Sequence, residues 1–268
     1  MACSREEAEK ALEDMMVSRV FGESGSQVVI EEFLAGQEMS ILAFVDGETV
    51  RPMPAAQDHK PVFDDDKGPN TGGMGTYSPL PHIDDAIIQK AIETIVEPTA
   101  KAMVSEGRPF RGILFAGLMI SPDGTPKTVE FNARFGDPET QVVLPRLKSD
   151  LLEIFLAAVD GRLADIEIEW SDEAAVCVVL ASQGYPGSYP KGMPISGLAE
   201  AGQEGLIFHA GTALGSDGSI VTNGGRVLGV VGLGAGIAEA RNAAYANANR
   251  ISFDGKQNRT DIAAKALQ

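Results

Sequence analysis

The chain has few of the residues that cross-link a protein or anchor it in a membrane. Among 268 residues there are only two cysteines, Cys3 and Cys177, which lie far apart and lack metal-ligand spacing. No apolar run reaches the length of about 18 residues that a membrane-spanning helix needs. The first residues also lack the apolar core of a signal peptide. These absences predict a cytoplasmic protein whose thiols are free.

Basic residues are also scarce relative to acidic ones. The sequence has 22 Lys and Arg against 38 Asp and Glu, which gives a formal net charge of −16. Such a charge repels nucleic acid and anionic membranes, so we expect neither as a partner. An acidic protein can still bind a nucleotide through a divalent cation and backbone N–H groups. With 44% hydrophobic residues, the composition is that of an ordinary globular protein.

Hydrophobic periodicity predicts an α+β fold in two domains. A capping box at Ser4–Glu7 predicts a first helix, and residues 54–82, rich in Gly, Pro and Asp, predict a long loop. The expected strands and helices of the first part are a strand over 27–34, hairpins of 39–45 with 48–53 and of 112–120 with 127–132, and helices over 84–107 and 149–159. After Trp170 the pattern changes to short strands and Gly-rich turns, followed by a helix over 237–250. We therefore place the domains at 1–170 and 171–268.

The most informative run covers residues 130–139, EFNARFGDPE. In a strand, alternate side chains point to opposite faces, which predicts Val129, Phe131 and Ala133 in the core. Glu130, Asn132 and Arg134 would then share the other face. A carboxylate and an amide oxygen can hold a hard cation, and a guanidinium beside them can steady a phosphate. The alternative is the exposed polar face of an edge strand.

The predicted strand at 27–34 leads into a possible adenine-binding hinge. Its end carries two carboxylates and an apolar pair, in the order Glu31, Glu32, Phe33 and Leu34. Backbone groups would read the base edge while the apolar pair flanks it, and Glu38 could reach the ribose hydroxyls. The alternative is a surface strand end with solvated glutamates.

Four glycines in the eight residues 68–75, GPNTGGMG, allow backbone N–H groups to approach an anion. The alternative for this run is a mobile turn. Just before it, the run Gln57–Lys60 could contact substrate or phosphate, although a histidine in a polar loop is more often solvated. Gly232–Gly236 fails the spacing of a dinucleotide-binding loop and predicts a tight strand-to-helix connection. Trp170, His82 and His209 form no constellation and are interpreted as structural.

Taken in order, these motifs resemble one enzyme family. The motifs are IEEFLAGQE, QDHK, GPNTGGMGTYSP, VEFNARFGDPETQ, GYPG, FHAGT and VTNGGRVLGV. The chain resembles the phosphoribosylamine–glycine ligases (glycinamide ribonucleotide synthetases) of the ATP-grasp superfamily, from about Ser4 to its end. The resemblance implies a partial ATP-grasp domain, with an antiparallel sheet and flanking helices, and a smaller C-terminal α+β domain.

The resemblance also implies an activity. ATP would phosphorylate the glycine carboxylate, and the amine of 5-phosphoribosylamine would attack the acyl phosphate to give glycinamide ribonucleotide, ADP and phosphate, with Mg²⁺ or Mn²⁺ neutralising charge. Arg134 would be catalytic, by stabilising the transferring phosphoryl group. The other implied roles are metal ligation by Glu130 and Asn132, adenine binding by Glu31, Glu32, Phe33 and Leu34, ribose binding by Glu38, nucleotide contact by Asn70, and shaping of the glycine and phosphoribosylamine site by Gly72, Gly73, Met74 and Asp137.

Two departures from the family pattern modify this expectation. The family has an N-terminal α/β domain and the rest of the first ATP-binding lobe before the position that matches Ser4. Pro61 stands where the family often has an arginine. We therefore expect the chain alone to bind ATP weakly and to have little ligase activity, unless a separate polypeptide supplies the missing part. The alternative is a non-catalytic remnant that binds nucleotide or a partner.

Overall fold

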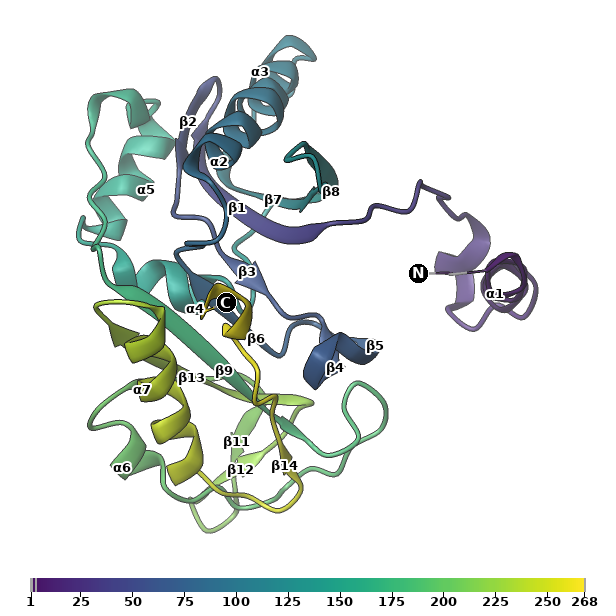
Figure 1. Cartoon of the computed structure of the whole chain (residues 1–268), viewed down its shortest axis with the longest axis vertical. Helices are drawn as coiled ribbons and strands as arrows, with labels where there is room; N and C mark the ends of the chain where they lie inside the picture. The colour runs from purple at the N-terminus through teal and green to yellow at the C-terminus, as the bar shows by residue number, and fades with distance from the viewer. Residues whose placement is uncertain (1, 3, 268) are drawn as a thin grey trace. The chain divides into compact units, whose positions relative to one another are not determined.

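The computed structural model describes residues 2 and 4–267 and divides into two compact units, one up to Gly36 and one from Gln37 onward (Figure 1). The first unit contains α1 (Arg5–Leu12), a π-helical turn (Glu13–Val17) and a 3₁₀ helix (Gly22–Ser26). The Ser4 hydroxyl accepts a hydrogen bond from the Glu7 amide at 3.2 Å, so the predicted helix start is confirmed.

The strand predicted over 27–34 is wrong. Residues 28–35 have no regular secondary structure, although Val29, Ile30 and Phe33 are apolar. A strand forms only when a neighbouring strand takes up its backbone N–H and C=O groups. The described residues of the first unit include helices but no strand that could do so. The apolar run alone therefore did not determine the structure.

The second unit begins with a four-stranded antiparallel sheet in the order β2-β1-β7-β8. Its strands are β1 (Gln37–Asp46), β2 (Thr49–Pro52), β7 (Arg111–Ile120) and β8 (Pro126–Asn132). The two predicted hairpins are confirmed: β1 turns into β2 through Gly47, which has φ 62°, and β7 turns into β8. Strand β8 lies at one edge of this sheet.

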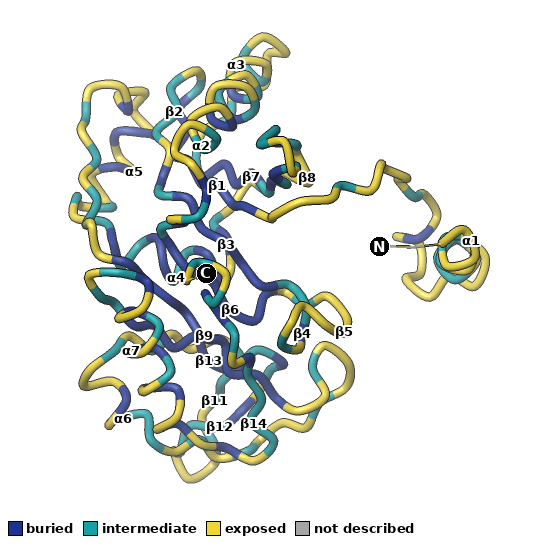
Figure 2. Tube along the Cα trace, in the orientation of Figure 1, coloured by how far each residue is buried: buried dark blue, intermediate teal, exposed yellow. Residues whose placement is uncertain are grey.

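Helices cover both faces of this sheet, and the buried stretch along β1 is visible in Figure 2. On one face, Ile41 and Val45 pack in one core with Val96 of the helical segment between α2 (Asp85–Ala91) and α3 (Glu97–Ser105). On the other face, Phe44 packs with Ile154 of α5 (Leu151–Asp160). Because β1 is buried on both faces, its sequence is almost continuously apolar rather than alternating.

The predicted helix over 84–107 begins as expected and is irregular in the middle. The Asp84 side chain caps it by accepting from the Ala86 amide at 2.8 Å. A π-helical turn, Ile92–Val96, precedes Pro98, whose missing N–H interrupts the regular hydrogen bonding. The helix predicted over 149–159 is α5, which is capped by Asp150 and ended by Gly161 with φ 73°.

A second sheet has the order β10-β13-β9-β6-β3, with β14 also paired to β9. Its strands are β3 (Gln57–Asp58), β6 (Gly75–Ser78), β9 (Ala174–Ser182), β10 (Leu206–His209), β13 (Arg226–Gly234) and β14 (Lys256–Gln257). The sheet joins strands from both sides of residue 170, and the boundary predicted there stays a prediction. Helix α7 (Ile237–Arg250) packs against β9 and β13.

The remaining elements are short. They are β4 (Pro61–Phe63), β5 (Lys67–Asn70), β11 (Thr212–Leu214), β12 (Ile220–Thr222), α4 (Thr140–Val143), α6 (Leu198–Ala201) and 3₁₀ helices Asp64–Asp66, Leu144–Arg146, Leu163–Asp165 and Ala264–Leu267. The predicted loop over 54–82 thus contains four short strands, β3 to β6, joined by other segments. In the part of the chain that the structure describes, no helix has both the length and the apolar composition that a membrane crossing needs.

The tight connection predicted at Gly232–Gly236 is confirmed. Strand β13 ends at Gly234 and α7 starts at Ile237. A Cβ on Gly232 would lie 2.3 Å from the backbone oxygen of Ala240, and a Cβ on Gly234 would lie 2.6 Å from its backbone nitrogen. These glycines let the helix backbone approach the strand, which is a packing role rather than a phosphate-binding one.

Candidate functional site

The exposed edge strand β8 presents the predicted metal ligands side by side. The Asn132 Nδ2 atom donates to Glu130 Oε1 at 3.1 Å, so the two side chains share one side of the strand as the alternation predicted. Glu130 is exposed and Asn132 half-buried. Their placement leaves a carboxylate and an amide accessible to a ligand.

The other half of the alternation argument is wrong, because β8 contains a β-bulge. Gly117 pairs with Glu130 and Leu118 pairs with Thr128, so Val129 is an extra residue in the ladder. Val129 is 45% exposed and Phe131 39% exposed, and Ala133 is exposed as well, so none of them lies in the core. The prediction assumed regular alternation and a covered face, whereas β8 pairs with one strand only, β7, and its pleat is interrupted by the bulge.

The turn after β8 carries Arg134 and Asp137. The Arg134 side chain is exposed and donates from Nη1 to the carbonyl of Phe135 at 2.8 Å. Asp137 is fixed from two sides, by Gln141 Nε2 on Oδ1 at 2.9 Å and by Arg226 Nη2 on Oδ2 at 2.8 Å. The Asp137 carboxylate is therefore a positioned acceptor, and the Arg134 guanidinium faces solvent.

Arg226, at the start of β13, joins this turn to the glycine-rich loop. Its Nη1 donates to the carbonyls of Gly72 at 2.7 Å and Asp137 at 2.8 Å. A Cβ on Gly72 would meet the Arg226 guanidinium carbon at 3.0 Å, so the loop needs a small residue there. The Gly72 amide donates to the hydroxyl of Tyr185 at 2.9 Å. Two residues from beyond position 170 thus hold a loop and a turn from before it.

Sequence reasoning did not identify Arg226 and Tyr185 as part of this site. Both lie in runs that carry the family resemblance, GYPG and VTNGGRVLGV, but neither run has a spacing that indicates a partner. Their partners are about 89 to 154 positions away along the chain. Only the pairing of β13 and β9 with β6 makes them neighbours of the glycine-rich loop.

A buried ion pair lies beneath the loop. Lys60 Nζ contacts Asp58 Oδ2 at 2.7 Å, and the Asp58 side chain is almost fully buried. A Cβ on Gly73 would meet both carboxylate oxygens of Asp58 at 2.6 Å. Burial raises the pKa of Asp58, although Lys60 acts against it. The pKa of Lys60 is raised, because Asp58, Glu139 and Glu38 outweigh the effect of its burial.

Two more carboxylates extend this cluster toward β1. Glu139 is buried and accepts from the Ser40 hydroxyl at 3.2 Å. Although Glu38 as a whole residue is exposed, desolvation of its carboxyl group raises its pKa, and Lys60 partly offsets that effect. Strand β3, the turn after β8 and the start of β1 therefore each place one acidic side chain near Lys60.

His59 supports the loop from the core rather than from solvent. It is buried, its Nδ1 lies 3.1 Å from the carbonyl of Gly75, and burial lowers its pKa to about 4. The neutral imidazole is therefore the native form, and the solvated role favoured from sequence is wrong. Its neighbour Gln57 accepts a hydrogen bond from the Tyr77 hydroxyl.

The remaining predicted site residues are placed as follows. Asn70 is exposed at the end of β5, opposite Pro61. Met74 is fully buried with Val62 and Ala181, so its side chain shapes the loop from beneath. The predicted adenine hinge, Glu31, Glu32, Phe33 and Leu34, lies in the unstructured run of the first unit, and its contact with nucleotide stays a prediction.

The donor set on β8 is compatible with a hard divalent cation. Carboxylate and amide oxygens are the protein ligands that Mg²⁺ and Mn²⁺ prefer, and rotating the Asn132 amide would present its oxygen beside Glu130. Among residues 2 and 4–267, no group of three or more His, Cys, Asp or Glu could hold a metal. A cation here would therefore take most of its ligands from phosphate and water.

Comparison with known proteins defines the wider class. Residues 1–140 match the family "Phosphoribosylglycinamide synthetase, ATP-grasp (A) domain" and residues 175–265 match its C domain. The chain superposes on the crystal structure of a phosphoribosylamine–glycine ligase from Thermotoga maritima with a TM-score of 0.83 and 39% identity, covering 96% of this chain and 64% of that one. A biotin carboxylase from Campylobacter jejuni shares the fold, with a TM-score of 0.63 at 11% identity, covering 94% of this chain and 53% of that one.

The antiparallel sheets and these likenesses place the chain among the ATP-grasp folds. It is 51% identical to a phosphoribosylamine–glycine ligase of Vibrio parahaemolyticus over 268 residues, which are 100% of this chain and 62% of that protein. It is 53% identical to the one of Halalkalibacterium halodurans, covering 100% of this chain and 61% of that protein. The chain therefore belongs to the phosphoribosylglycinamide synthetase family, and it spans about three fifths of the length of these relatives.

Proposed function

We propose that this chain carries the larger part of a ligase that joins glycine to 5-phosphoribosylamine with ATP, to give glycinamide ribonucleotide, ADP and phosphate. The observation that carries the proposal is the adjacency of Glu130 and Asn132 on the exposed edge of β8, beside a turn that Arg226 fastens to the glycine-rich loop. The relatives named phosphoribosylamine–glycine ligase support it.

Glu130 and Asn132 would hold Mg²⁺ or Mn²⁺, which when bound supplies positive charge to the nucleotide phosphates. Arg134 extends from the same edge, and its exposed guanidinium would stabilise negative charge on the transferring phosphoryl group. Glu38 would accept hydrogen bonds from the ribose, and Asn70 would contact the nucleotide. The adenine role of Glu31, Glu32, Phe33 and Leu34 is part of the same proposal.

The amino-acid substrate would bind between the glycine-rich loop and the Asp137 turn. The Asp137 carboxylate, fixed by Gln141 and Arg226, is suited to a positively charged amine such as that of glycine. The Gly72 and Gly73 amides already donate to the hydroxyls of Tyr185 and Thr71, each at 2.9 Å, so these glycines would shape the site through their lack of a side chain, with buried Met74 beneath them. The predicted separate polypeptide, the cytoplasmic location and the absence of nucleic-acid and membrane partners all stay predictions.

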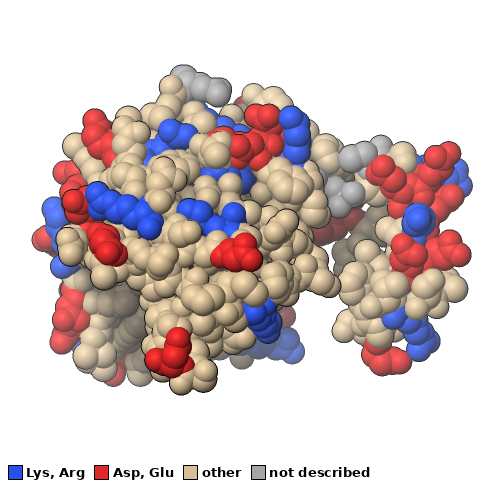
Figure 3. All heavy atoms as spheres, turned by 90° about the horizontal axis from the view of Figure 1, so that it is seen from below, with Lys and Arg blue, Asp and Glu red and all other residues tan. Residues whose placement is uncertain are grey.

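In Figure 3, which shows one face of the molecule, Lys and Arg side chains are interspersed with Asp and Glu. No single basic patch dominates that face among the residues drawn in colour. A mixed surface of this kind suits small charged substrates bound at a local site better than a long polyanion.

The proposal is tested by calorimetric titration of the purified chain with ATP, with and without Mg²⁺. We expect binding that strengthens with Mg²⁺ in the wild type and loses most of that dependence in Glu130→Ala. Glu167→Ala, which removes another exposed carboxylate, is the matched control and should behave as wild type. If Glu130→Ala keeps the full Mg²⁺ dependence, the metal role of Glu130 is wrong. If neither titration gives binding, the nucleotide site is wrong.

A further inference from the structure

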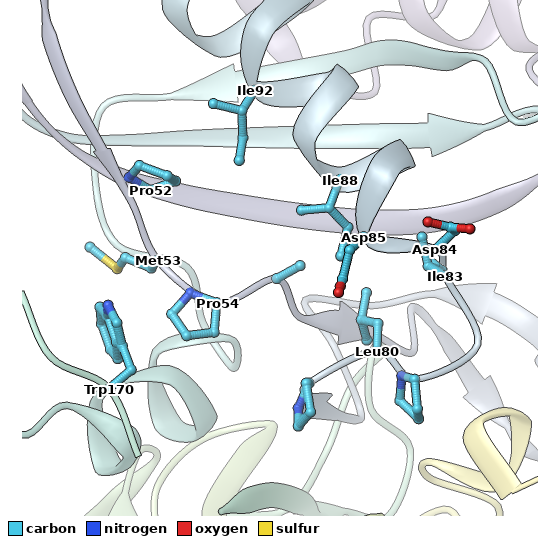
Figure 4. Close-up of a pocket in the computed structure, with 13 residues that line it drawn as sticks. Pro52, Met53, Pro54, Leu80, Ile83, Asp84, Asp85, Ile88, Ile92 and Trp170 are labelled. Atoms are coloured by element: carbon cyan, nitrogen blue, oxygen red, sulfur yellow. The ribbon is translucent and has the colours of Figure 1, made fainter. Parts of the chain in front are cut away.

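A concave site lies away from the proposed nucleotide and substrate residues. It is a groove of about 700 Å³ in the second unit, lined by residues of three segments, which lie within 52–55, within 79–92 and at Trp170. Figure 4 shows the segment with Met53 and Pro54 facing Leu80 and Ile88 of the segment opposite. The lining shares no residue with the proposed nucleotide or substrate site, and the volume is in the range of small-ligand pockets.

The floor of the groove is apolar and its walls are stiff. Met53, Ala55, Leu80, Ile83 and Ile92 are apolar and buried. Four prolines line the walls, and their rings have few conformations to lose when a ligand binds. The floor therefore favours an apolar body, and the walls need little reordering to accept it.

Hydrogen bonds tie the three wall segments together. The Ser78 hydroxyl, next to Pro79, donates to the carbonyl of Ala55 at 2.7 Å. Buried Arg146 donates to the Ser78 hydroxyl at 2.6 Å and to the carbonyl of Ser171 at 3.2 Å, next to Trp170. The backbone of Trp170 is further held by a β-bridge to Leu147. The groove is thus formed before any ligand arrives.

The charges of the lining have one sign. Asp84 and Asp85 lie at the end of the groove away from Trp170 in Figure 4. Asp84 uses Oδ1 to accept from the Ala86 amide, and both aspartates are exposed. Among the described residues, those that line the groove include no Lys, Arg or His. The two carboxylates would therefore repel a negatively charged ligand and attract a cation.

We infer that this groove binds a small organic cation, a protonated amine on a compact apolar body. The apolar part would lie over Met53, Leu80 and Ile83, and the ammonium group at Asp84 and Asp85. Trp170 is the single tryptophan of the chain and lines the groove, so a ligand that fills the groove should change its fluorescence. The inference is independent of the ligase function, because it uses neither the nucleotide nor the substrate residues.

The test is a fluorescence titration of the full chain with three probes of one shape: cyclohexylmethylammonium, cyclohexylmethanol and cyclohexanecarboxylate. We expect a saturable change with the ammonium probe, binding weaker by about fivefold for the alcohol, and none for the carboxylate. The double variant Asp84→Asn/Asp85→Asn keeps a capping residue and should lower the ammonium affinity to that of the alcohol, whose own affinity should not change. Glu106→Gln/Glu167→Gln, which also removes two exposed carboxylates but elsewhere on the surface, is the control and should bind as wild type does.

Two results would overturn the inference. One is the absence of any saturable change in Trp170 fluorescence when the folded wild type, checked by cooperative thermal unfolding, is titrated with the ammonium probe. The other is equal affinity for the ammonium probe and the alcohol, which would make the groove an apolar docking surface without charge selectivity. Ile88→Arg places a fixed cation beside the carboxylates and should abolish ammonium binding; retained binding in a folded Ile88→Arg variant contradicts the assigned position.

Discussion

Replacing Arg226 with glutamine should loosen the glycine-rich loop and destabilise the second unit. The guanidinium makes two hydrogen bonds to backbone carbonyls and one to the Asp137 carboxylate, all at 2.7 to 2.8 Å. Hydrogen bonds that involve a charged group contribute roughly 1.5–3 kcal/mol each, and they are not additive. The Arg226 side chain is 21% exposed and that of Asp137 52% exposed, so solvent screens the carboxylate pair. We expect a loss of about 3 kcal/mol in the free energy of unfolding for Arg226→Gln, and about 1 kcal/mol for Arg226→Lys, which keeps the charge but not the fork.

Urea unfolding monitored by Trp170 fluorescence measures the global effect, and hydrogen exchange of the Gly72, Gly73 and Met74 amides measures the local one. Both should change in Arg226→Gln. The control is Arg162→Gln, because the Arg162–Asp160 pair at 3.0 Å joins side chains that are both about half exposed. Its loss should cost less than about 0.5 kcal/mol. If Arg226→Gln is as stable as Arg162→Gln and the loop amides exchange at the wild-type rate, Arg226 does not hold the loop.

Three further predictions concern the supports of the site. Folding lowers the pKa of His59 from 6.5 to about 4. The stability that neutral His59 contributes is therefore complete above pH 6.5 and is lost as the pH falls toward 4. In urea unfolding, the stability advantage of wild type over His59→Gln should shrink by about 3 kcal/mol across that range. The difference between the two proteins cancels the opposite effect of Asp58, whose raised pKa favours low pH, and a constant difference would contradict the neutral histidine. Gly73→Ala should destabilise by about 2 kcal/mol or more in thermal unfolding, since φ is 115° and the new Cβ would lie 2.5 Å from Pro138 Cδ; an unchanged melting temperature would refute the packing. Asp150→Ala should cost about 1 kcal/mol in the same assay by removing the acceptor for the Leu152 and Glu153 amides, whereas Ser149→Ala should cost less.

Local signals in the sequence predicted the elements that depend on neighbours in the chain. The capping residues Ser4 and Asp84 start their helices, and Gly47 and Gly161 turn the chain where positive φ is required. The two hairpins of the first sheet were predicted because each is closed by a short turn. Helix starts and tight turns depend on only a few adjacent residues, so the local sequence is enough to predict them.

The errors came where a partner strand decides the structure. Among the described residues of the first unit, the apolar run over 27–34 has no partner strand and stays irregular, while parts of the Gly-rich run over 54–82 find partners and form short strands. Likewise, the bulge at Val129 depends on the pairing of β8 with β7, and it exposes Phe131 although the pattern placed it in the core. Hydrophobic periodicity indicates which secondary structure a segment prefers, but it does not indicate which strand the segment will pair with.

The sequence by itself determined which polar residue types stand at which spacing, and through its ordered motifs which family the chain resembles. Glu130 and Asn132 lie two positions apart in a strand, and that spacing alone places them side by side. Only the tertiary structure decided that Arg226 and Tyr185 hold the glycine-rich loop, that His59 is buried and neutral, and that Trp170 lines a groove. The physical reason is distance along the chain, because contacts between residues a hundred positions apart follow from how sheets and helices pack and leave no periodic trace in the sequence.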